Sequence, residues 1–193
     1  MQGPAWNYWQ TNGHPFEITG NWNVKFTGGG PTLPTEIQTA KLASWTRFPD
    51  TNAQAFAGTA KYEITFDAPR LESSLSAAMG TLKRELPPFQ LDLGDVRQSA
   101  RVRVNGTDYG TLIAPPFRVV VDHLQPAGNV LEVEVTSVAA NRIRDLDRRG
   151  VNWKIFKDIN LVNVDYQPFD ASRWPLTDCG LLGPVTLSPV TAE

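Results

Sequence analysis

Residues 141–174 combine aromatic rings with side chains that form several hydrogen bonds in one plane. The apolar face of a pyranose packs on an aromatic ring, and its hydroxyls need polar groups held in place. This combination therefore predicts a sugar-binding site in the segment. Its predicted residues are Asn141, Arg142, Trp153, Asp158 and Tyr166.

The same segment allows two other interpretations. Arg142 could stack on an aromatic ring and hold the loop down by a cation–π contact, with no ligand involved. Alternatively, Arg142, Lys154 and Tyr166 could serve a small independent enzyme, a polysaccharide lyase or hydrolase. The paired carboxylates of a glycosidase must lie about 5–9 Å apart, and no pair of acids can be assigned that spacing from the sequence.

Cofactors are not indicated, apart from a structural calcium ion. Asp158, Asn160 and Asp165 offer oxygen ligands, but calcium takes six to eight of them, and these residues are scattered. The chain has two histidines, and Cys179 has no recognisable histidine partner. We therefore expect Cys179 to be inert.

Composition limits the partners that we expect. The 193 residues carry a net charge of −2, with scattered basic residues, so we predict no nucleic-acid partner. No apolar run reaches the ~20 residues of a membrane span, and we expect a monomer. The first residues lack the pattern of a signal peptide. We therefore expect a mature or excised piece whose parent protein is extracellular or periplasmic.

Short strands dominate the rest of the sequence. Alternating apolar residues and frequent glycine and proline predict an all-β protein; examples are the segments 22–26, 60–66, 101–104 and 130–135. Asn105-Gly106 predicts a tight hairpin turn. Residues 42–45 are expected to begin a further short strand. About eight strands in this order indicate a jelly-roll β-sandwich whose first and last parts meet.

Three segments stand apart from the strand pattern. Residues 1–19, with Trp6, Tyr8 and Trp9, are predicted to form an aromatic strap ahead of the β-sandwich domain of residues 20–193. Residues 70–88 are an insertion, and apolar residues spaced three or four apart predict one short helix within it. Residues 141–174 are expected to form an irregular charged excursion.

Several short stretches carry a family resemblance through their order. They are Ser44-Trp45-Thr46, Phe56-Ala57-Gly58-Thr59-Ala60-Lys61-Tyr62, Leu91-Asp92-Leu93-Gly94-Asp95-Val96, Val104-Asn105-Gly106, Pro115-Pro116-Phe117-Arg118, Asn129-Val130-Leu131-Glu132-Val133, Asn141-Arg142-Ile143 and Gly180-Leu181-Leu182-Gly183-Pro184-Val185. The chain resembles the carboxyl-terminal galactose-binding-like β-sandwich of glycoside hydrolase family 106, the α-L-rhamnosidase-like proteins. More distantly, it resembles the sugar-binding jelly roll of family 2 glycosidases.

The resemblance implies a module without catalytic activity of its own. In such enzymes the catalytic carboxylates and their calcium lie in a separate barrel, and this chain lacks the alternating strands and helices of a barrel. The module would bind plant or microbial polysaccharide, or buttress the catalytic barrel. A purely structural module without a ligand is the remaining alternative, and it predicts that Trp6 and Trp153 are buried.

Overall fold

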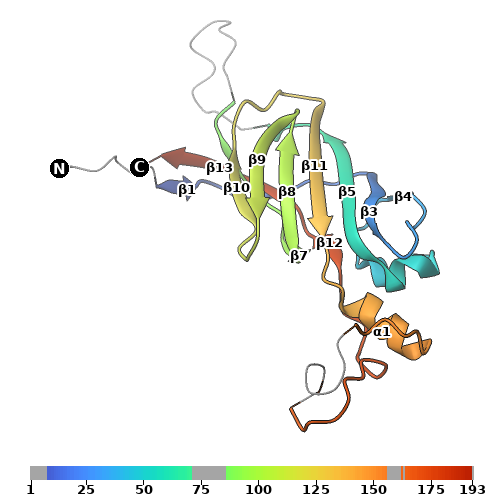
Figure 1. Cartoon of the computed structure of the whole chain (residues 1–193). Coiled ribbons are helices and arrows are strands. Elements are labelled where there is room, and N and C mark those ends of the chain that lie inside the picture. Colours follow the sequence, from blue (N-terminus) through green and yellow to red (C-terminus); the bar gives the residue numbers. More distant parts are fainter. Residues whose placement is uncertain (1–7, 71–85, 156–161, 163, 193) are drawn as a thin grey trace, which may run out of the picture.

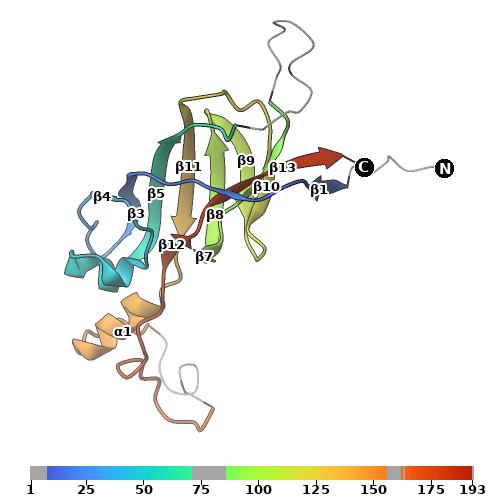
Figure 2. The same ribbon diagram turned by 180° about the vertical axis from the view of Figure 1, so that it is seen from behind.

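The chain folds into an all-β sandwich, as predicted. The computed structural model describes residues 8–70, 86–155, 162 and 164–192. Two large antiparallel sheets form two layers (Figures 1 and 2). Apolar side chains from both layers fill the space between them, and Trp22, Phe56, Tyr62, Phe89 and Leu131 are each at most 2% exposed.

The larger sheet has six strands in the order β4-β3-β5-β11-β8-β9. Their bounds are Ile37–Thr39 (β4), Trp22–Gly30 (β3), Ala57–Phe66 (β5), Asn129–Thr136 (β11), Ser99–Val104 (β8) and Thr107–Leu112 (β9). In β11 the residues facing the core are Leu131, Val133 and Val135, and each is fully buried. The predicted alternation is therefore confirmed, because every second side chain of a strand points to the same face.

The second sheet has the order β1-β13-β6-β10, and β2 also pairs with β13. Its strands are Trp9–Thr11 (β1), Thr186–Ala192 (β13), Phe89–Asp92 (β6), Arg118–Val121 (β10) and Phe16–Glu17 (β2). A small third sheet pairs β12 (Gly180–Gly183) with β7 (Asp95–Arg97). The first and last strands of the chain therefore meet, as the sequence predicted.

The turns and helices confirm one expectation and correct two. Asn105 and Gly106 both have positive φ, 50° and 81°, as the predicted hairpin requires. Residues 42–45 form no strand. Instead, Trp45 begins a short 3₁₀ helix, η1 (Trp45–Arg47), because the Ser44 hydroxyl accepts a hydrogen bond from the Thr46 amide. The excursion is not irregular throughout, since it opens with an α-helix, α1 (Ala140–Arg148).

Several predicted features fall outside the described residues. The helix predicted in the 70–88 insertion is one of them, since residues 71–85 are not described, and Trp6 is another. Residues 8–19 of the predicted strap are described, and they contain the strands β1 and β2. Among the described residues no helix is long and apolar enough to span a membrane.

One buried tyrosine joins three distant parts of the chain. The Tyr62 hydroxyl, on β5, accepts hydrogen bonds from the Trp45 indole N–H at 2.5 Å and from the Leu181 amide at 3.1 Å. Burial raises the pKa of Tyr62. A Cβ on Gly180 would overlap both the Trp45 indole nitrogen and the Tyr62 hydroxyl. Only glycine therefore allows β12 to approach this close.

Replacing this hydroxyl tests its role. Tyr62→Phe leaves two buried N–H donors without an acceptor, and we expect it to lower the free energy of unfolding by about 2–4 kcal/mol. Urea unfolding followed by tryptophan fluorescence measures the loss. Tyr109→Phe is the matched control, because the Tyr109 hydroxyl is hydrogen-bonded to Asp122 at a partly exposed site. Equal losses in the two variants would contradict the assignment.

Candidate functional site

The excursion is closed at its base by Asn141. This residue lies in the first turn of α1 and is 4% exposed. Its Nδ2 donates to the Thr177 carbonyl at 2.7 Å, and its Oδ1 accepts from the Thr177 amide at 2.8 Å. The two hydrogen bonds tie the start of the excursion to the segment between its end and β12. Both polar atoms of the Asn141 amide, which was predicted to bind a sugar, therefore already have partners within the protein.

Helix α1 owes its stability to short-range charge pairs and a glycine stop. Asp145 accepts from Arg142 at 3.2 Å, three residues away, and from Arg149 at 3.0 Å, four residues away. Such pairs stabilise a helix. Gly150, with φ of 64°, follows the last turn in the conformation that commonly ends helices.

A small aromatic core forms beyond the helix. Phe169 packs edge-on against Trp153 and against Trp174, with ring centroids 6.1 and 5.5 Å apart. The Lys154 ammonium lies 5.7 Å from the Trp153 ring centroid and donates to the Phe169 carbonyl at 2.6 Å. A cation–π contact therefore does hold the loop, but Lys154 makes it, while Arg142 pairs with Asp145.

Asp147 is the polar centre of this core. Its side chain is 6% exposed, and its carboxylate accepts from the Trp153 indole and from the Ala171 amide, each at 2.7 Å. The Lys154 ammonium lies 3.3 Å away. Burial opposes ionisation of Asp147, but these donors outweigh it and lower the pKa of Asp147.

A hollow of about 340 Å³ lies between α1 and the 3₁₀ helix η2 (Thr51–Ala55). Most of its lining side chains are polar or basic, and two, Ala55 and Leu176, are apolar. The lining residues are Thr51, Gln54, Ala55, Asn141, Arg144, Asp145, Arg148, Arg149 and Leu176. Figure 1 shows α1 directly beyond the end of the sandwich where η2 lies. The hollow is therefore formed jointly by the sandwich and the excursion.

The hollow's arginines differ in what they contact. Arg149 binds the Asp145 carboxylate, and Arg144 uses its Nε to donate to the Trp174 carbonyl at 2.6 Å. Arg148 is exposed, and its side chain forms no ion pair or hydrogen bond within the described part of the chain. The hollow therefore presents guanidinium groups that are still able to bind a ligand.

The five residues predicted from the sequence are placed differently by the structure. Asn141 lies in the wall of the hollow, and Arg142 contacts Asp145 on the same helix. Trp153 belongs to the aromatic core and is neither fully buried nor exposed. Tyr166 is 76% exposed, and Asp158 lies outside the described residues. Their role in sugar binding stays a prediction.

Sequence reasoning did not select Arg144, Arg148, Thr51 or Gln54. The run from Asp147 to Arg149 has the pattern of a solvated charged face. The one available signal was the four-residue spacing of Arg144 and Arg148, which places both on one side of a helix. Nothing local connects them to η2, which lies some ninety residues earlier.

A metal site is not formed by the residues in the described ranges, where no group of three or more His, Cys, Asp or Glu side chains could hold an ion. Two of the three residues considered for calcium, Asp158 and Asn160, are not among those residues. The structural calcium ion stays a prediction. Cys179 is buried, and burial raises the pKa of its thiol, which disfavours the reactive thiolate.

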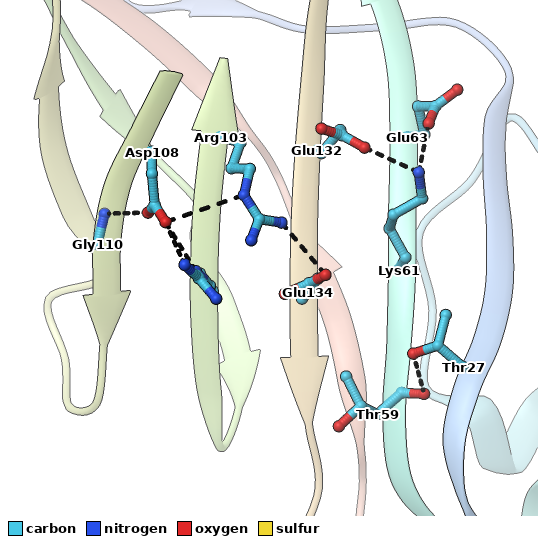
Figure 3. A network of polar contacts seen from close by, with 10 residues as sticks. Thr27, Thr59, Lys61, Glu63, Arg103, Asp108, Gly110, Glu132 and Glu134 are labelled. Atoms are coloured by element: carbon cyan, nitrogen blue, oxygen red, sulfur yellow. Dashed lines mark hydrogen bonds and ion pairs between the residues drawn. The ribbon is translucent and has the colours of Figure 1, made fainter. Parts of the chain in front are cut away.

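The outer face of the six-stranded sheet carries many charged side chains, and these form ion pairs with one another. Figure 3 shows Lys61 between two carboxylates, those of Glu63 and Glu132, each at 2.8 Å. Hydrogen bonds to Glu132 and Glu63 raise the pKa of Lys61 to about 12. On the neighbouring strands Arg103 lies 3.2 Å from Glu134. Acids and bases oppose one another across the strands, so this face offers no excess of either charge.

Comparisons with known proteins place the chain among glycosidase domains. No protein-family model matches it. A putative β-glucuronidase of Formosa agariphila is 30% identical to it over an alignment that covers 90% of this chain and 16% of that protein. The chain therefore spans about 16% of the length of the curated relative it matches.

Solved structures agree with this placement. The rhamnosidase from Novosphingobium sp. PP1Y superposes with a TM-score of 0.64 and 25% identity, covering 97% of this chain and 16% of that one. A family 2 β-galacturonidase from Eisenbergiella tayi has a TM-score of 0.52 and 20% identity, covering 93% of this chain and 26% of that one. The second match shows a shared fold. Both matches occupy a small part of a larger glycoside hydrolase.

The buried carboxylate of the excursion gives a testable pH dependence. Because the folded pKa of Asp147 lies below its ordinary value of 3.8, its stabilising effect is complete above pH ~4 and is lost as the pH falls through the folded pKa. Asp147→Asn removes the charge at every pH. We expect amide exchange in residues 147–155 and 164–174 to become at least about tenfold faster at pH 7, because the buried carboxylate that holds Trp153, Lys154 and Ala171 is lost.

Hydrogen exchange with mass spectrometry measures this effect. Asp170→Asn is the matched control, since Asp170 accepts from the Ser172 amide at 2.8 Å in an exposed turn. Its exchange should stay close to that of the parent chain. Unchanged exchange in Asp147→Asn would refute the assigned role.

Proposed function

We propose that this chain is a non-catalytic, carbohydrate-binding module of a rhamnosidase-like glycoside hydrolase. The similarity covers nearly all of this chain but only 16% of the putative β-glucuronidase and 16% of the rhamnosidase. A segment of that size within a larger glycosidase fits an accessory module. A polysaccharide substrate, of plant or microbial origin, would place the parent enzyme outside the cell or in the periplasm.

The observation that carries sugar binding is the hollow between η2 and α1. Its volume of about 340 Å³ falls in the range of small-molecule sites, roughly 300–1,000 Å³. The Thr51 hydroxyl and the Gln54 amide offer donors and acceptors for sugar hydroxyls. Ala55 and Leu176 supply apolar surface for the carbon face of a sugar ring.

A buttressing role is the second candidate, and a different observation favours it. The excursion and the residues just after it expose several large apolar side chains: Val151, Ile155, Val164, Tyr166, Trp174 and Leu176. Exposed apolar groups gathered on one segment often mark a surface that another domain covers. Packing against a catalytic barrel would bury them.

The independent-enzyme hypothesis depended on Arg142, Lys154 and Tyr166. In the structure the Lys154 ammonium is held by Asp147 and by the Phe169 carbonyl, within the aromatic core. These contacts favour a structural role for Lys154 over a catalytic one. An assay of the purified chain on aryl α-L-rhamnosides and aryl β-glucuronides tests the enzyme directly, and turnover would overturn the proposed function.

Calorimetric titration against a sugar panel tests the proposed function. The panel contains L-rhamnose, neutral oligosaccharides and uronate-containing oligosaccharides such as rhamnogalacturonan fragments. We expect saturable heat with at least one member, and loss of that heat in a Gln54→Ala, Leu176→Ala double variant of the hollow. Ile113→Ala, on a residue that is 79% exposed in another part of the sandwich, is the control. Absence of binding to every sugar would reject the module's carbohydrate role in favour of buttressing.

A further inference from the structure

We infer that the hollow between η2 and α1 binds a sugar that carries a carboxylate, that is, a hexuronate unit of an acidic saccharide. This inference rests on the proposed carbohydrate-binding function and names its ligand class. It is carried by the charges around the hollow and by the contacts those charges already make.

Positive charge exceeds negative charge in the lining. Three arginines, Arg144, Arg148 and Arg149, surround the hollow, and Asp145 is the one carboxylate among the lining residues. Asp145 already accepts hydrogen bonds from Arg149 and from Arg142 outside the hollow. A ligand in the hollow therefore meets uncompensated guanidinium groups.

The donors that remain are suited to a planar anion. Among the described residues the whole guanidinium of Arg148 is available, and Arg144 uses its Nε alone, at the Trp174 carbonyl. The two parallel N–H groups of an arginine match the two oxygens of a carboxylate, and such charge-assisted pairs are about twice as strong as neutral hydrogen bonds. A hexuronate offers one carboxylate beside several hydroxyls.

The rest of the lining suits the remainder of such a sugar. Thr51 and Gln54 come from η2, opposite the arginines of α1, and can bind hydroxyls while the carboxylate faces α1. Leu176 and Ala55 provide the apolar surface. An isolated inorganic anion would use only the arginines and would not need the side chains of η2.

The charges around the hollow contrast with those on the outer face of the six-stranded sheet. On the outer face of the six-stranded sheet Lys61 and Arg103 each pair with a carboxylate from the adjacent strand β11, Glu132 and Glu134 respectively (Figure 3). The whole chain carries a net charge of −2. Binding of an acidic saccharide is therefore expected at the hollow rather than over the general surface.

Titration with matched ligands tests the inference on the full 193-residue chain. The probes are tetragalacturonate, methyl β-D-glucuronide, the methyl ester of each, L-rhamnose, and sodium sulfate as an inorganic anion. We expect the acids to bind and the esters to bind at least about tenfold more weakly. Added salt should weaken the binding of the acids and leave that of the esters unchanged. Sulfate should compete weakly.

Variants locate the binding. Arg148→Gln should weaken binding of the acids about tenfold or more, with an intermediate loss for Arg148→Lys, which keeps the charge but not the planar pair of donors. Because the Arg148 side chain has no partner among the described residues, the melting temperature of both variants should stay at the parent value. Arg118→Gln, on β10 in the other sheet, is the charge-matched control and should bind within about twofold of the parent chain.

The outcomes separate the two proposals. Equal binding of acid and ester, or an Arg148→Gln variant that binds as the parent does, overturns the hexuronate assignment. Binding of neutral sugars alone overturns it too, while the carbohydrate-binding function stands. Failure of every saccharide to bind overturns both. Sulfate binding as strongly as the acids would show a simple anion site and would also reject the inference.

Discussion

The buried hydroxyl of Tyr62 is the contact on which the rest of the structure depends. It binds Trp45, which precedes β5, and Leu181, which follows the excursion and lies 119 residues after Tyr62. Two further hydrogen bonds join the same segments, from the Trp45 amide to the Cys179 carbonyl and from the Cys179 amide to the Ser44 hydroxyl. Buried donors need such acceptors. The end of the excursion is therefore anchored to the core of the sandwich.

From this anchor the excursion is built outward in two steps. The amide of Asn141 joins the start of α1 to Thr177, and the carboxylate of Asp147 then organises Trp153, Lys154 and Ala171. Each step satisfies polar groups that lie away from water, and each would be unfavourable if one partner were missing. The excursion therefore has its own small core, and the position of α1 is set by the sandwich beneath it.

Charge is distributed unevenly over this frame for a geometrical reason. Across the six-stranded sheet, side chains of adjacent strands lie opposite or diagonal to one another, so an acid on one strand can neutralise a base on the next, as Glu132 does for Lys61 on the diagonal. Helix α1 has no such neighbouring strand, and its arginines outnumber its aspartates. Arg148 consequently faces the solvent and the hollow without an acid to bind, which gives the end of the sandwich a chemistry that the sheet faces lack.

The sequence by itself determined the sandwich, because the alternation of buried and exposed residues in strands such as β5 and β11 is a local property of neighbouring positions. The positive φ required at Asn105 and Gly106 is local in the same way. The aromatic and charged content of 141–174 distinguished this segment from the strands, and the structure places α1 and the aromatic core there. The start of η1 at Trp45, the helix α1 and the hollow were decided only by the tertiary structure. They arise where the end of β11 and the beginning of β5 bring η2 and α1 together, and contacts between such distant segments leave no periodic signal in the sequence.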